Sequence, residues 1–498
     1  MSILPNRDLK IIVQYICLAV LLWLNFYSPA NAQQDFIQIP CAIQIASSVS
    51  DGAFSIEEIV KAARQCGIKA VILGERDLMQ WEYGIWPLRN LLKRTIKEKS
   101  LFSFGIKRYL TEIKKIQKMN PDILVITGIE SAPFYYWQGE FWDNDFSLKN
   151  WHKHLLCIGF EDSKVIERLP VIGNKKGLAK PISIKDILLL WPVLLIIFAV
   201  AIFRRMRQRE HNKYRIPQVG LAIGLILLAV AFLLNNWPFR RYWFNQYQGD
   251  LKHLPYQRYI DYVVENGGLV FWLHPDTENI SKDGPINIET RRYSFDLYRT
   301  HNYTGFALLY DGLKYTGAIG GVWDGLLNSS LKNTKRKPVW AIGALGIDEI
   351  KDLKEAILYL RTVVFAKDFT KEAVLEALRN GRLYILQGKR AKDFLLEELN
   401  IFEPKMFVSK TIGQSLEIEK GRSVHLRLRG KFLNRPMEKI KVKLVKNGQL
   451  IKTLEVETPF EVVFQENDIT ENTFYRLIIE AKDLLVFTNP VFVKLKFS

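Results

Sequence analysis

Apolar and polar positions follow their most regular pattern between residues 40 and 77. A first apolar run ends at a Ser-Asp-Gly turn, 50–52. Ser55 and Glu58 have the spacing of a capping box, and the apolar residues after them recur at helical intervals. A second apolar run, 70–73, follows a glycine stop. The pattern predicts a strand, a capped helix and a second, parallel strand, so the chemistry should lie at the carboxyl ends of the strands.

The C-terminal part of the chain, 401–498, changes to strict alternation. Apolar residues alternate with basic ones in 424–429 and again in 440–444, and Asn447-Gly448 is typical of a hairpin turn. We therefore predict a small β-sandwich over this part of the chain. Its basic face is expected to be a solvated sheet face.

Two long apolar segments lie in the middle of the chain. The segment 187–203 has 17 residues without a charge, and the segment 216–237 has 22. These lengths suit two membrane-spanning helices. The loop 204–215 between them carries six basic residues, which places it on the cytoplasmic side. A buried core hairpin is the alternative.

The N-terminal segment, 1–32, has the features of an export signal. Arg7 and Lys10 precede an apolar run, and the small residues Ala30 and Ala32 suit cleavage at its end. An uncleaved anchor is the alternative. Either form exports the segment that follows, so with two further spans the globular parts should be extracytoplasmic, in the periplasm or at the cell surface.

Three polar residues lie at the ends of predicted buried strands. Glu130 closes one apolar run, His154 directly precedes another, and His274, in a His-Pro pair, ends a third. Glu130 and His274 therefore lie where a parallel α/β sheet carries its chemistry, at the carboxyl ends of strands, whereas His154 lies at the opposite end of its strand. A solvated strand end is the alternative for Glu130, and the nearby His152 is expected at the surface.

The strand-helix-strand segment resembles the opening of the PHP family (polymerase and histidinol phosphatase domains). The first strand of that family reads D-L-H-x-H-S-x-x-S-D-G, and its second strand ends in T-D-H. Here the Ser-Asp-Gly, which includes Asp51, and the spacing both match. Gln44 and Ala46 replace the two histidines of the first strand, and Glu75-Arg76 replaces the Asp-His of the second.

The resemblance continues through later motifs of the family. Glu130 matches the family's G-I-E, His154 matches a histidine that precedes a hydrophobic strand, and His274-Pro275 resembles A-H-P. Asp348 falls near the histidine of the family's S-D-x-H motif.

The matching motifs cover 40–170 and 256–387, on both sides of the apolar segments. The resemblance therefore implies an α/β fold, a PHP-type distorted β/α barrel that a two-helix transmembrane hairpin interrupts and a small all-β sandwich follows. In chain order the predicted parts are a signal peptide (1–32), the first part of the barrel (33–180), the hairpin with its basic cytoplasmic loop (181–238), the second part of the barrel (239–400) and the β-sandwich (401–498).

The resemblance also implies a reduced metal site. PHP enzymes hold two or three divalent ions through His, Asp and Glu ligands and act on a phosphoester or related bond. The implied metal ligands are Glu130, His154 and His274, with Glu75 as a further candidate, and the residues of the ligand cleft are Gln44, Asp51, Arg76 and Asp348. An amide and a methyl group cannot replace two imidazoles, and Arg76 brings a cation. We therefore expect one divalent ion, zinc or manganese, or none, and assign no catalytic residue.

The composition limits the partners. The formal net charge of +18 favours an anionic neighbour, and 48% hydrophobic residues exclude a disordered chain. No nucleic-acid-binding motif accompanies the charge, so we expect a lipid bilayer and an anionic small molecule or protein, and no specific nucleic acid. Of the four cysteines, Cys17 would leave with the signal peptide; Cys41, Cys66 and Cys157 lack metal-binding spacing and are expected to be buried apolar residues, with at most one disulfide as the alternative.

Two functions fit these residues. The first is a membrane-anchored, extracytoplasmic PHP-like protein with a degenerate metal site, which acts as a non-catalytic or weakly active binding module. The alternative is a metal-dependent phosphoesterase or related hydrolase that uses the reduced metal site. The missing ligands favour the first function, and metal analysis of the purified protein would discriminate between the two.

Overall fold

The computed structural model describes most of the chain. The described residues are 36–142, 145–177, 179–208, 215–237, 243–309, 311–333, 335–346, 353–406, 408–434 and 437–496. The chain divides into an N-terminal unit (Cys41–Ala318 with Ile342–Ile357) and a C-terminal unit (Ile319–Ala341 with Leu358–Ser498, and the residues before Cys41). The predicted signal peptide, 1–32, and Asp348 lie outside the described residues.

The N-terminal unit begins with the predicted strand-helix-strand segment. Strands β1 (Ile37–Ile45), β2 (Ala70–Leu73) and β6 (Leu124–Ile126) pair in parallel. Helix α2 (Ile56–Gln65) begins at the predicted capping box: the Ser55 hydroxyl accepts a hydrogen bond from the Glu58 N–H, and the Glu58 carboxylate accepts one from the Ser55 N–H. The parallel pairing and the capped helix confirm the prediction for this segment.

A second sheet joins the two halves of the chain that flank the apolar segments. Its order includes β14 (Gly305–Leu309), β11 (Leu269–Trp272), β10 (Leu155–Ile158), β7 (Gly128–Ser131) and β3 (Glu75–Arg76). Strand β10 is antiparallel to both of its neighbours, with Leu155 opposite Ser131 on one side and Trp272 on the other. The mixed α/β prediction is confirmed. In the described residues these ladders are separate sheets, so the closed barrel stays a prediction.

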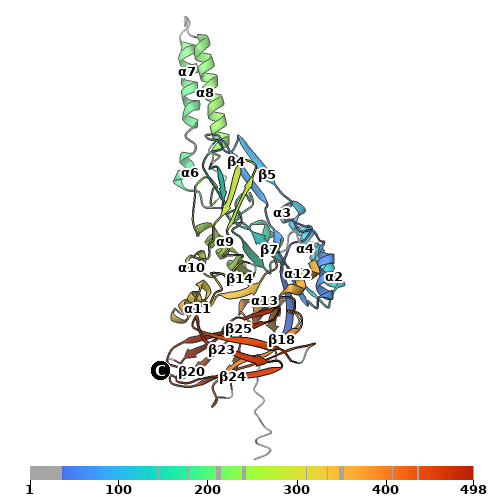
Figure 1. Cartoon of the computed structure of the whole chain (residues 1–498). Helices are drawn as coiled ribbons and strands as arrows, with labels where there is room; N and C mark the ends of the chain where they lie inside the picture. The colour runs from blue at the N-terminus through green and yellow to red at the C-terminus, as the bar shows by residue number, and fades with distance from the viewer. Residues whose placement is uncertain are drawn as a thin grey trace, which may run out of the picture. The chain divides into compact units, whose positions relative to one another are not determined.

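Further strands and helices complete the N-terminal unit (Figure 1). A four-stranded sheet has the order β12 (Asn279–Asp283), β13 (Ile286–Thr290), β9 (Ser147–Lys149) and β8 (Tyr136–Gln138), and a hairpin pairs β4 (Gln80–Gly84) with β5 (Lys93–Lys97). The other helices are α3 (Leu101–Phe104), α4 (Ile106–Met119), α5 (Ser163–Glu167), α9 (Leu254–Glu265), α10 (Asp296–Arg299) and α12 (Leu353–Tyr359). Aromatic rings fill the space between the hairpin and the small sheet, where Trp137 stacks on Phe146 at 4.7 Å.

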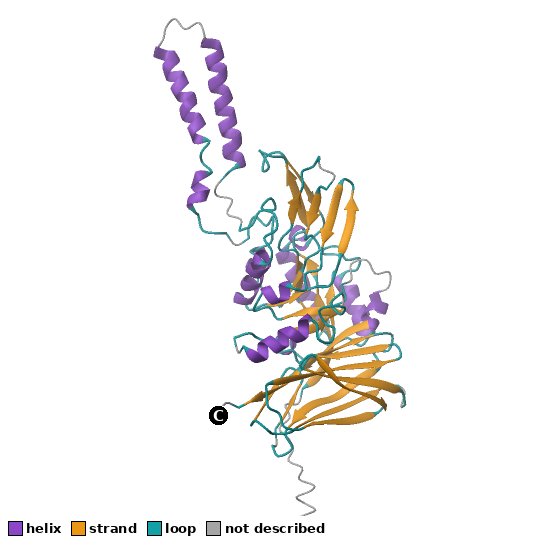
Figure 2. Ribbon diagram, turned by 60° about the vertical axis from the view of Figure 1, so that its left-hand side comes forward, coloured by secondary structure: helices purple, strands orange, loops and turns teal. Residues whose placement is uncertain are grey.

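The apolar segments form a pair of neighbouring helices (Figure 2). A short α6 (Ile184–Leu188) precedes α7 (Val193–Gln208), and α8 (Arg215–Asn235) follows. By length and composition, Ile184–Arg207 and Ile216–Asn235 could each cross a membrane, and most of their side chains are exposed. Half of the predicted basic loop, 209–214, lies outside the described residues.

The C-terminal unit is mostly β-structure. One sheet has the order β19 (Ser409–Thr411), β18 (Phe394–Phe402), β21 (Val424–Phe432) and β24 (Phe460–Glu466). The other has the order β20 (Ser415–Ile418), β27 (Val491–Leu495), β25 (Thr473–Ala481), β26 (Leu484–Thr488), β17 (Leu383–Gln387) and β16 (Leu360–Ala366), with β22 (Lys439–Lys446) on β25 and β23 (Gln449–Glu457) beyond it. Its helices are α11 (Val322–Lys332) and α13 (Lys371–Arg379), and β15 (Trp340–Gly343) runs across the boundary of the units.

The predicted alternation places apolar residues inside this unit. Val424, Leu426 and Leu428 are buried in its core, and Asn447 and Gly448 both have positive φ at the hairpin turn. The sequence-based boundary at residue 400 differs from the observed grouping. Residues 358–400 belong with the C-terminal strands because β17 pairs with β26, a long-range pairing that local pattern does not reveal.

An ion pair without access to water holds helix α11 to strand β25 inside the C-terminal unit. Asp324 accepts two hydrogen bonds of 2.7 Å from Arg476, and the two side chains are 1% and 0% exposed. The Arg476 guanidinium also lies 4.9 Å from the centre of the Trp323 ring. Because both charges have lost their hydration, each depends on the other for compensation.

Replacing one partner of this pair should be strongly destabilising. We expect Arg476→Met to lower the free energy of unfolding by about 3–5 kcal/mol, because Asp324 would keep a buried charge without a counterion. Denaturant unfolding of the C-terminal unit measures the effect. Arg427→Met, which breaks an exposed pair with Glu461, is the control and should cost less than about 1 kcal/mol. A double Arg476→Met, Asp324→Leu variant as unstable as the single one would contradict this explanation.

Candidate metal centre

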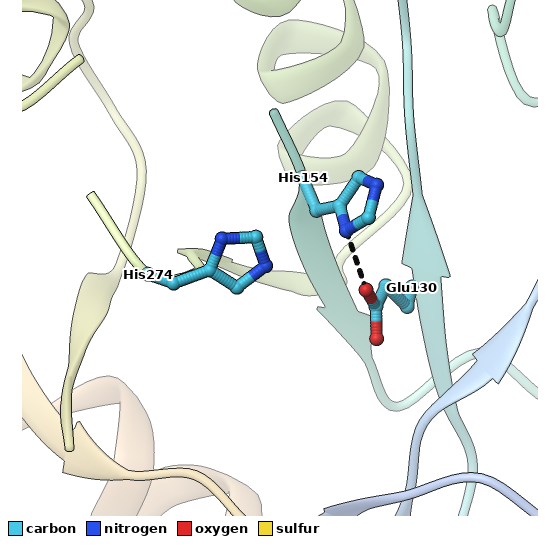
Figure 3. A group of neighbouring side chains, drawn as sticks. All are labelled: Glu130, His154 and His274. Carbon is cyan, nitrogen blue, oxygen red and sulfur yellow. Dashed lines mark ion pairs between the residues drawn. The ribbon is translucent and has the colours of Figure 1, made fainter. Parts of the chain in front are cut away.

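Three of the predicted ligands converge at one edge of the second sheet. Glu130 is part of β7, His154 directly precedes β10, and His274 follows β11 by two residues. Since β10 lies between β7 and β11, the three side chains meet, and one ligand atom from each lies within 4.8 Å of the others (Figure 3). All three residues are buried. The arrangement could hold one metal ion.

Both oxygens of the Glu130 carboxylate have a close polar neighbour. Its Oε1 lies 2.6 Å from Nδ1 of His154, and its Oε2 accepts a hydrogen bond of 2.9 Å from Nε2 of Gln44. Gln44 reaches this position because it has a φ of 64° at an irregularity in the β1–β2 ladder. The residue that replaces a family histidine is therefore a hydrogen-bond donor to the central carboxylate.

A hydrogen-bond chain defines which nitrogen of His274 can bind a metal. The Tyr293 hydroxyl donates to the Leu273 carbonyl at 2.6 Å, and the same oxygen lies 3.1 Å from Nδ1 of His274. A carbonyl oxygen can only accept, so the single hydroxyl proton goes to Leu273 and the Nδ1–H of His274 donates to Tyr293. This tautomer leaves the lone pair of His274 on Nε2, as a metal ligand requires.

Burial and neighbouring charges set the protonation of this group. Burial lowers the pKa of His274 to about 3, with His154 adding to the effect, so His274 is neutral at neutral pH. Burial alone would raise the pKa of Glu130, but its contact with His154 and the charge of Arg76 outweigh the effect of burial and hold the pKa well below its usual range. A carboxylate and a neutral imidazole are the forms that bind a metal.

Glu75, the further candidate ligand, is not part of this group. It is fully buried and accepts hydrogen bonds from the Ser47 hydroxyl at 2.5 Å, the Ser50 hydroxyl at 2.6 Å and the Ser47 N–H at 3.1 Å. Burial raises the pKa of Glu75, and the serine bonds oppose that rise. Ser47 and Ser50, which follow β1, thus bind the Glu75 carboxylate away from the three-ligand group.

The three ligands line a cavity of about 270 Å³. Its lining residues are Gln44, Ala46, Gly74, Arg76, Glu130, His152, His154, His274, Thr277, Asn279 and Gly346. Arg76 pairs with Asp51 at 2.8 Å, so the predicted cleft residues Gln44, Asp51 and Arg76 lie at or beside the cavity. The guanidinium offers an anion-binding group within reach of the ligand set.

Sequence reasoning missed several residues of this cavity. His152, expected at the surface, is half-buried in the cavity wall, and burial, with the charge of His154, lowers its pKa to about 4. The His-x-His spacing with His154 was the available signal. Thr277 and Asn279 follow the His-Pro turn, and Tyr293 is contributed from a more distant segment. Their positions follow from tertiary folding, which no local pattern encodes.

The fold and the ligand set describe an α/β protein with a candidate site for one metal ion. No protein-family model matches the chain, and no curated protein matches it. The chain is similar to a two-domain protein from Bacteroides vulgatus that contains a predicted PHP-like metal-dependent phosphoesterase, with 14% identity, a TM-score of 0.34 and coverage of 90% of this chain and 91% of that one. It is also similar to a protein from Bifidobacterium adolescentis provisionally described as a metal-dependent phosphoesterase, with 11% identity, a TM-score of 0.28 and coverage of 63% and 90%. Likeness at this level does not decide an activity, which we infer from the chain's own residues.

The hydrogen bond from His274 to Tyr293 should contribute to metal affinity. Tyr293→Phe keeps the ring but removes the oxygen that fixes the tautomer, so we expect zinc to bind about 10- to 100-fold more weakly. Isothermal titration with zinc measures the change. Tyr303→Phe removes another buried hydroxyl, which donates to the Leu297 carbonyl at 2.7 Å, and should leave zinc affinity unchanged. Equal losses in both variants would indicate a general effect on folding.

A buried carboxyl group behind the site should make stability depend on pH. Asp77 accepts hydrogen bonds of 2.6 Å from both the Ser131 hydroxyl and the Leu78 N–H, and burial raises its pKa from 3.8 to about 6. Between these values the unfolded chain ionises while the folded one stays protonated, so the contribution of Asp77 to stability falls as pH rises from about 4 to about 6.

Asp77→Asn should remove this dependence. The amide keeps the shape and one acceptor but cannot ionise, so the free energy of unfolding of the variant, relative to that of the unmodified protein, should rise by about 2 kcal/mol between pH 4 and pH 7. Denaturant unfolding at several pH values checks the difference. A constant difference across that range would show that Asp77 does not titrate as inferred.

Proposed function

We propose that the cavity binds one divalent cation, zinc or manganese, through Glu130, His154 and His274 and hydrolyses a phosphoester. The observation that carries this proposal is the convergence of three buried ligand atoms within 4.8 Å beside a guanidinium on the same cavity wall. Two imidazoles and one carboxylate form a common ligand set for catalytic zinc, which keeps a coordination position for water. The guanidinium of Arg76 suits the negative charge of a phosphoryl group.

The side chains around the ligands have separate roles in this mechanism. A bound divalent ion would supply an activated water and polarise the phosphoryl group. Gln44 holds the Glu130 carboxylate, and Tyr293 holds the ring of His274. Arg76, kept in place by Asp51, would bind the phosphoryl oxygens, and the neutral imidazole of His152 can accept a proton in the cavity.

The same residues favour one ion over a cluster. A carboxylate that bridges two ions needs an oxygen for each, but Oε2 of Glu130 already accepts the amide hydrogen of Gln44. Ala46 offers no donor atom at the next family position, and Arg76 adds a positive charge that opposes a second cation. The proposed activity would therefore proceed without the second ion that stabilises the leaving oxygen in two-metal enzymes.

A binding module without turnover is the second candidate function. The observation that favours it is the close contact of both Glu130 oxygens with other side chains: Oε1 lies 2.6 Å from Nδ1 of His154, and Oε2 accepts a hydrogen bond from Gln44. In that case the cavity would retain an anionic small molecule or a protein carboxylate through Arg76. The two candidates differ in whether a metal-loaded protein releases product.

We further propose that α7 and α8 cross a lipid bilayer and that both units lie on its extracytoplasmic side. The length and apolar character of the two helices support the spans, and Arg204, Arg205 and Arg207 at the end of α7 support a cytoplasmic loop. The predicted export signal would agree with this topology.

Metal content and turnover together test the catalytic proposal. Purified protein loaded with zinc or manganese should contain one ion per chain and hydrolyse p-nitrophenyl phosphate or its diester. His274→Ala removes a ligand, so metal affinity should fall at least about 100-fold, beyond the usual effect of a residue outside the ligand set, and turnover should be lost. His301→Ala, an exposed histidine of the same unit, is the control and should change neither.

The alternatives give different results in the same assays. One tightly bound ion without turnover of any phosphoester would support the binding module. Two or more ions per chain in the unmodified protein would contradict the single-ion site. Unchanged metal content in His274→Ala would exclude this ligand set.

A further inference from the structure

A cluster of large apolar side chains is exposed around the loop between β4 and β5. We call it the apolar tip, and its members are Ile85, Trp86, Leu91, Leu92, Phe141 and Trp142. The two tryptophans are 69% and 70% exposed. Ile85, Leu92 and Phe141 line a single groove, so the cluster is continuous across two segments of the chain. Soluble surfaces rarely leave a group of this size in water without a partner.

Hydrogen bonds tie this loop to the last residue of α8. The N–H of Asn90 donates to Oδ1 of Asn235 at 2.8 Å, and Nδ2 of Asn90 donates to the Asn235 carbonyl at 2.8 Å. Nδ2 of Asn235 donates in turn to the Pro87 carbonyl at 3.3 Å. Asn235 is buried by these contacts. The apolar tip therefore lies directly beside the end of the second apolar helix (Figure 1).

The loop that carries the apolar tip is held in one conformation. The N–H of Ile85 donates to the Leu92 carbonyl at 2.9 Å, and Arg89 pairs with Glu140 at 3.1 Å while it covers the ring of Tyr247. Gly84 is required by the same packing, because a Cβ at this position would lie 1.9 Å from the Arg89 carbonyl oxygen. A fixed loop presents its apolar side chains without a large cost in conformational entropy.

One exposed basic residue accompanies the apolar tip on β5. Arg94, the second residue of β5, is exposed, whereas Lys93 pairs with Glu82 at 2.7 Å and Lys97, opposite Gln80, lies at the other end of the hairpin. Apolar and tryptophan side chains beside an exposed cation suit the interface of a membrane that contains anionic lipids. The continuity of the apolar tip with the end of α8 favours the bilayer that α8 would cross over a separate protein partner.

We propose that the apolar tip inserts into the interfacial layer of that bilayer, as a membrane contact additional to α7 and α8. This inference rests on the proposed membrane spans and goes beyond the proposed catalysis. With the spans and the loop both held by lipid, the N-terminal unit would be fixed to the membrane at two places. Its cavity would then keep one orientation toward the surface.

A fluorescence experiment on the full chain in vesicles of zwitterionic and anionic lipid tests the proposal. Single cysteines replace Trp86 in the apolar tip, Leu227 in α8 and Met119 on α4, all of them exposed, and carry an environment-sensitive fluorophore. Cys41, Cys66 and Cys157 are buried, and the unmodified protein treated with the same reagent gives the background. Quenchers attached to lipid at shallow or deep positions, and iodide in the water, then report where each probe lies.

The three probes separate the possible outcomes. We expect shallow lipid quenchers to reduce the Trp86→Cys signal several-fold more than iodide does, deep quenchers to act on Leu227→Cys, and iodide alone to act on Met119→Cys. If Leu227→Cys responds to lipid but Trp86→Cys behaves like Met119→Cys, the apolar tip faces water or a protein and the inference is wrong. If iodide quenches Leu227→Cys, the spans are wrong and the inference fails with them, while the metal assays remain unaffected.

Discussion

The antiparallel ladder of β10 with β7 and β11 is the constraint on which the candidate site depends. Leu155 lies opposite Ser131 on one side and Trp272 on the other, so a single register places His154 between Glu130 and His274. A shift by one residue would turn every side chain of β10 to the other face of the sheet. The same ladder pairs β10 with β11, which more than 100 residues separate in sequence. Because the apolar helices α7 and α8 lie between these strands in the chain, the helices can be an insertion in one unit.

Hydrogen bonding within the ligand group sets the terms on which a metal could bind. Glu130 is buried and ionised; its Oε1 lies against Nδ1 of His154, and its Oε2 accepts a hydrogen bond from Gln44. A cation would have to replace at least the contact with His154, whereas an unpaired carboxylate would lose nothing on binding. The ionised Glu130 and the neutral His274 suit a metal ion, but the existing contacts of Glu130 reduce the free energy that metal binding would gain. A metal ion could therefore bind without turnover, so the number of bound ions and the rate of hydrolysis have to be measured separately.

Local pattern predicted the elements of the fold better than it predicted the site. The capping box at Ser55, the hairpin turn at Asn447 and the alternation in β21 depend on residues close in sequence, and each is present. The positive φ that turns Gln44 toward Glu130 depends instead on the packing of β1 against its neighbours. Likewise, the bond between Tyr293 and His274 and the pairing of β17 with β26 join segments whose separation in sequence carries no periodic signal. The motif made Glu75 a candidate metal ligand, but the hydroxyls of Ser47 and Ser50 bind its carboxylate outside the three-ligand group.

The charges of the residues around the cavity indicate how many metal ions and which ligand charge it can accept. With the imidazoles left aside, Glu130 and Asp51 contribute −2 and Arg76 contributes +1, which leaves a formal charge of −1. One divalent ion would bring the group to +1, a value that one monoanionic ligand neutralises, and a second ion would bring it to +3. Unbalanced charge at partly buried positions is costly because little water remains to screen it. Under the proposed function, the fixed positive charge of Arg76 would therefore favour a single metal ion together with an anionic ligand over two metal ions.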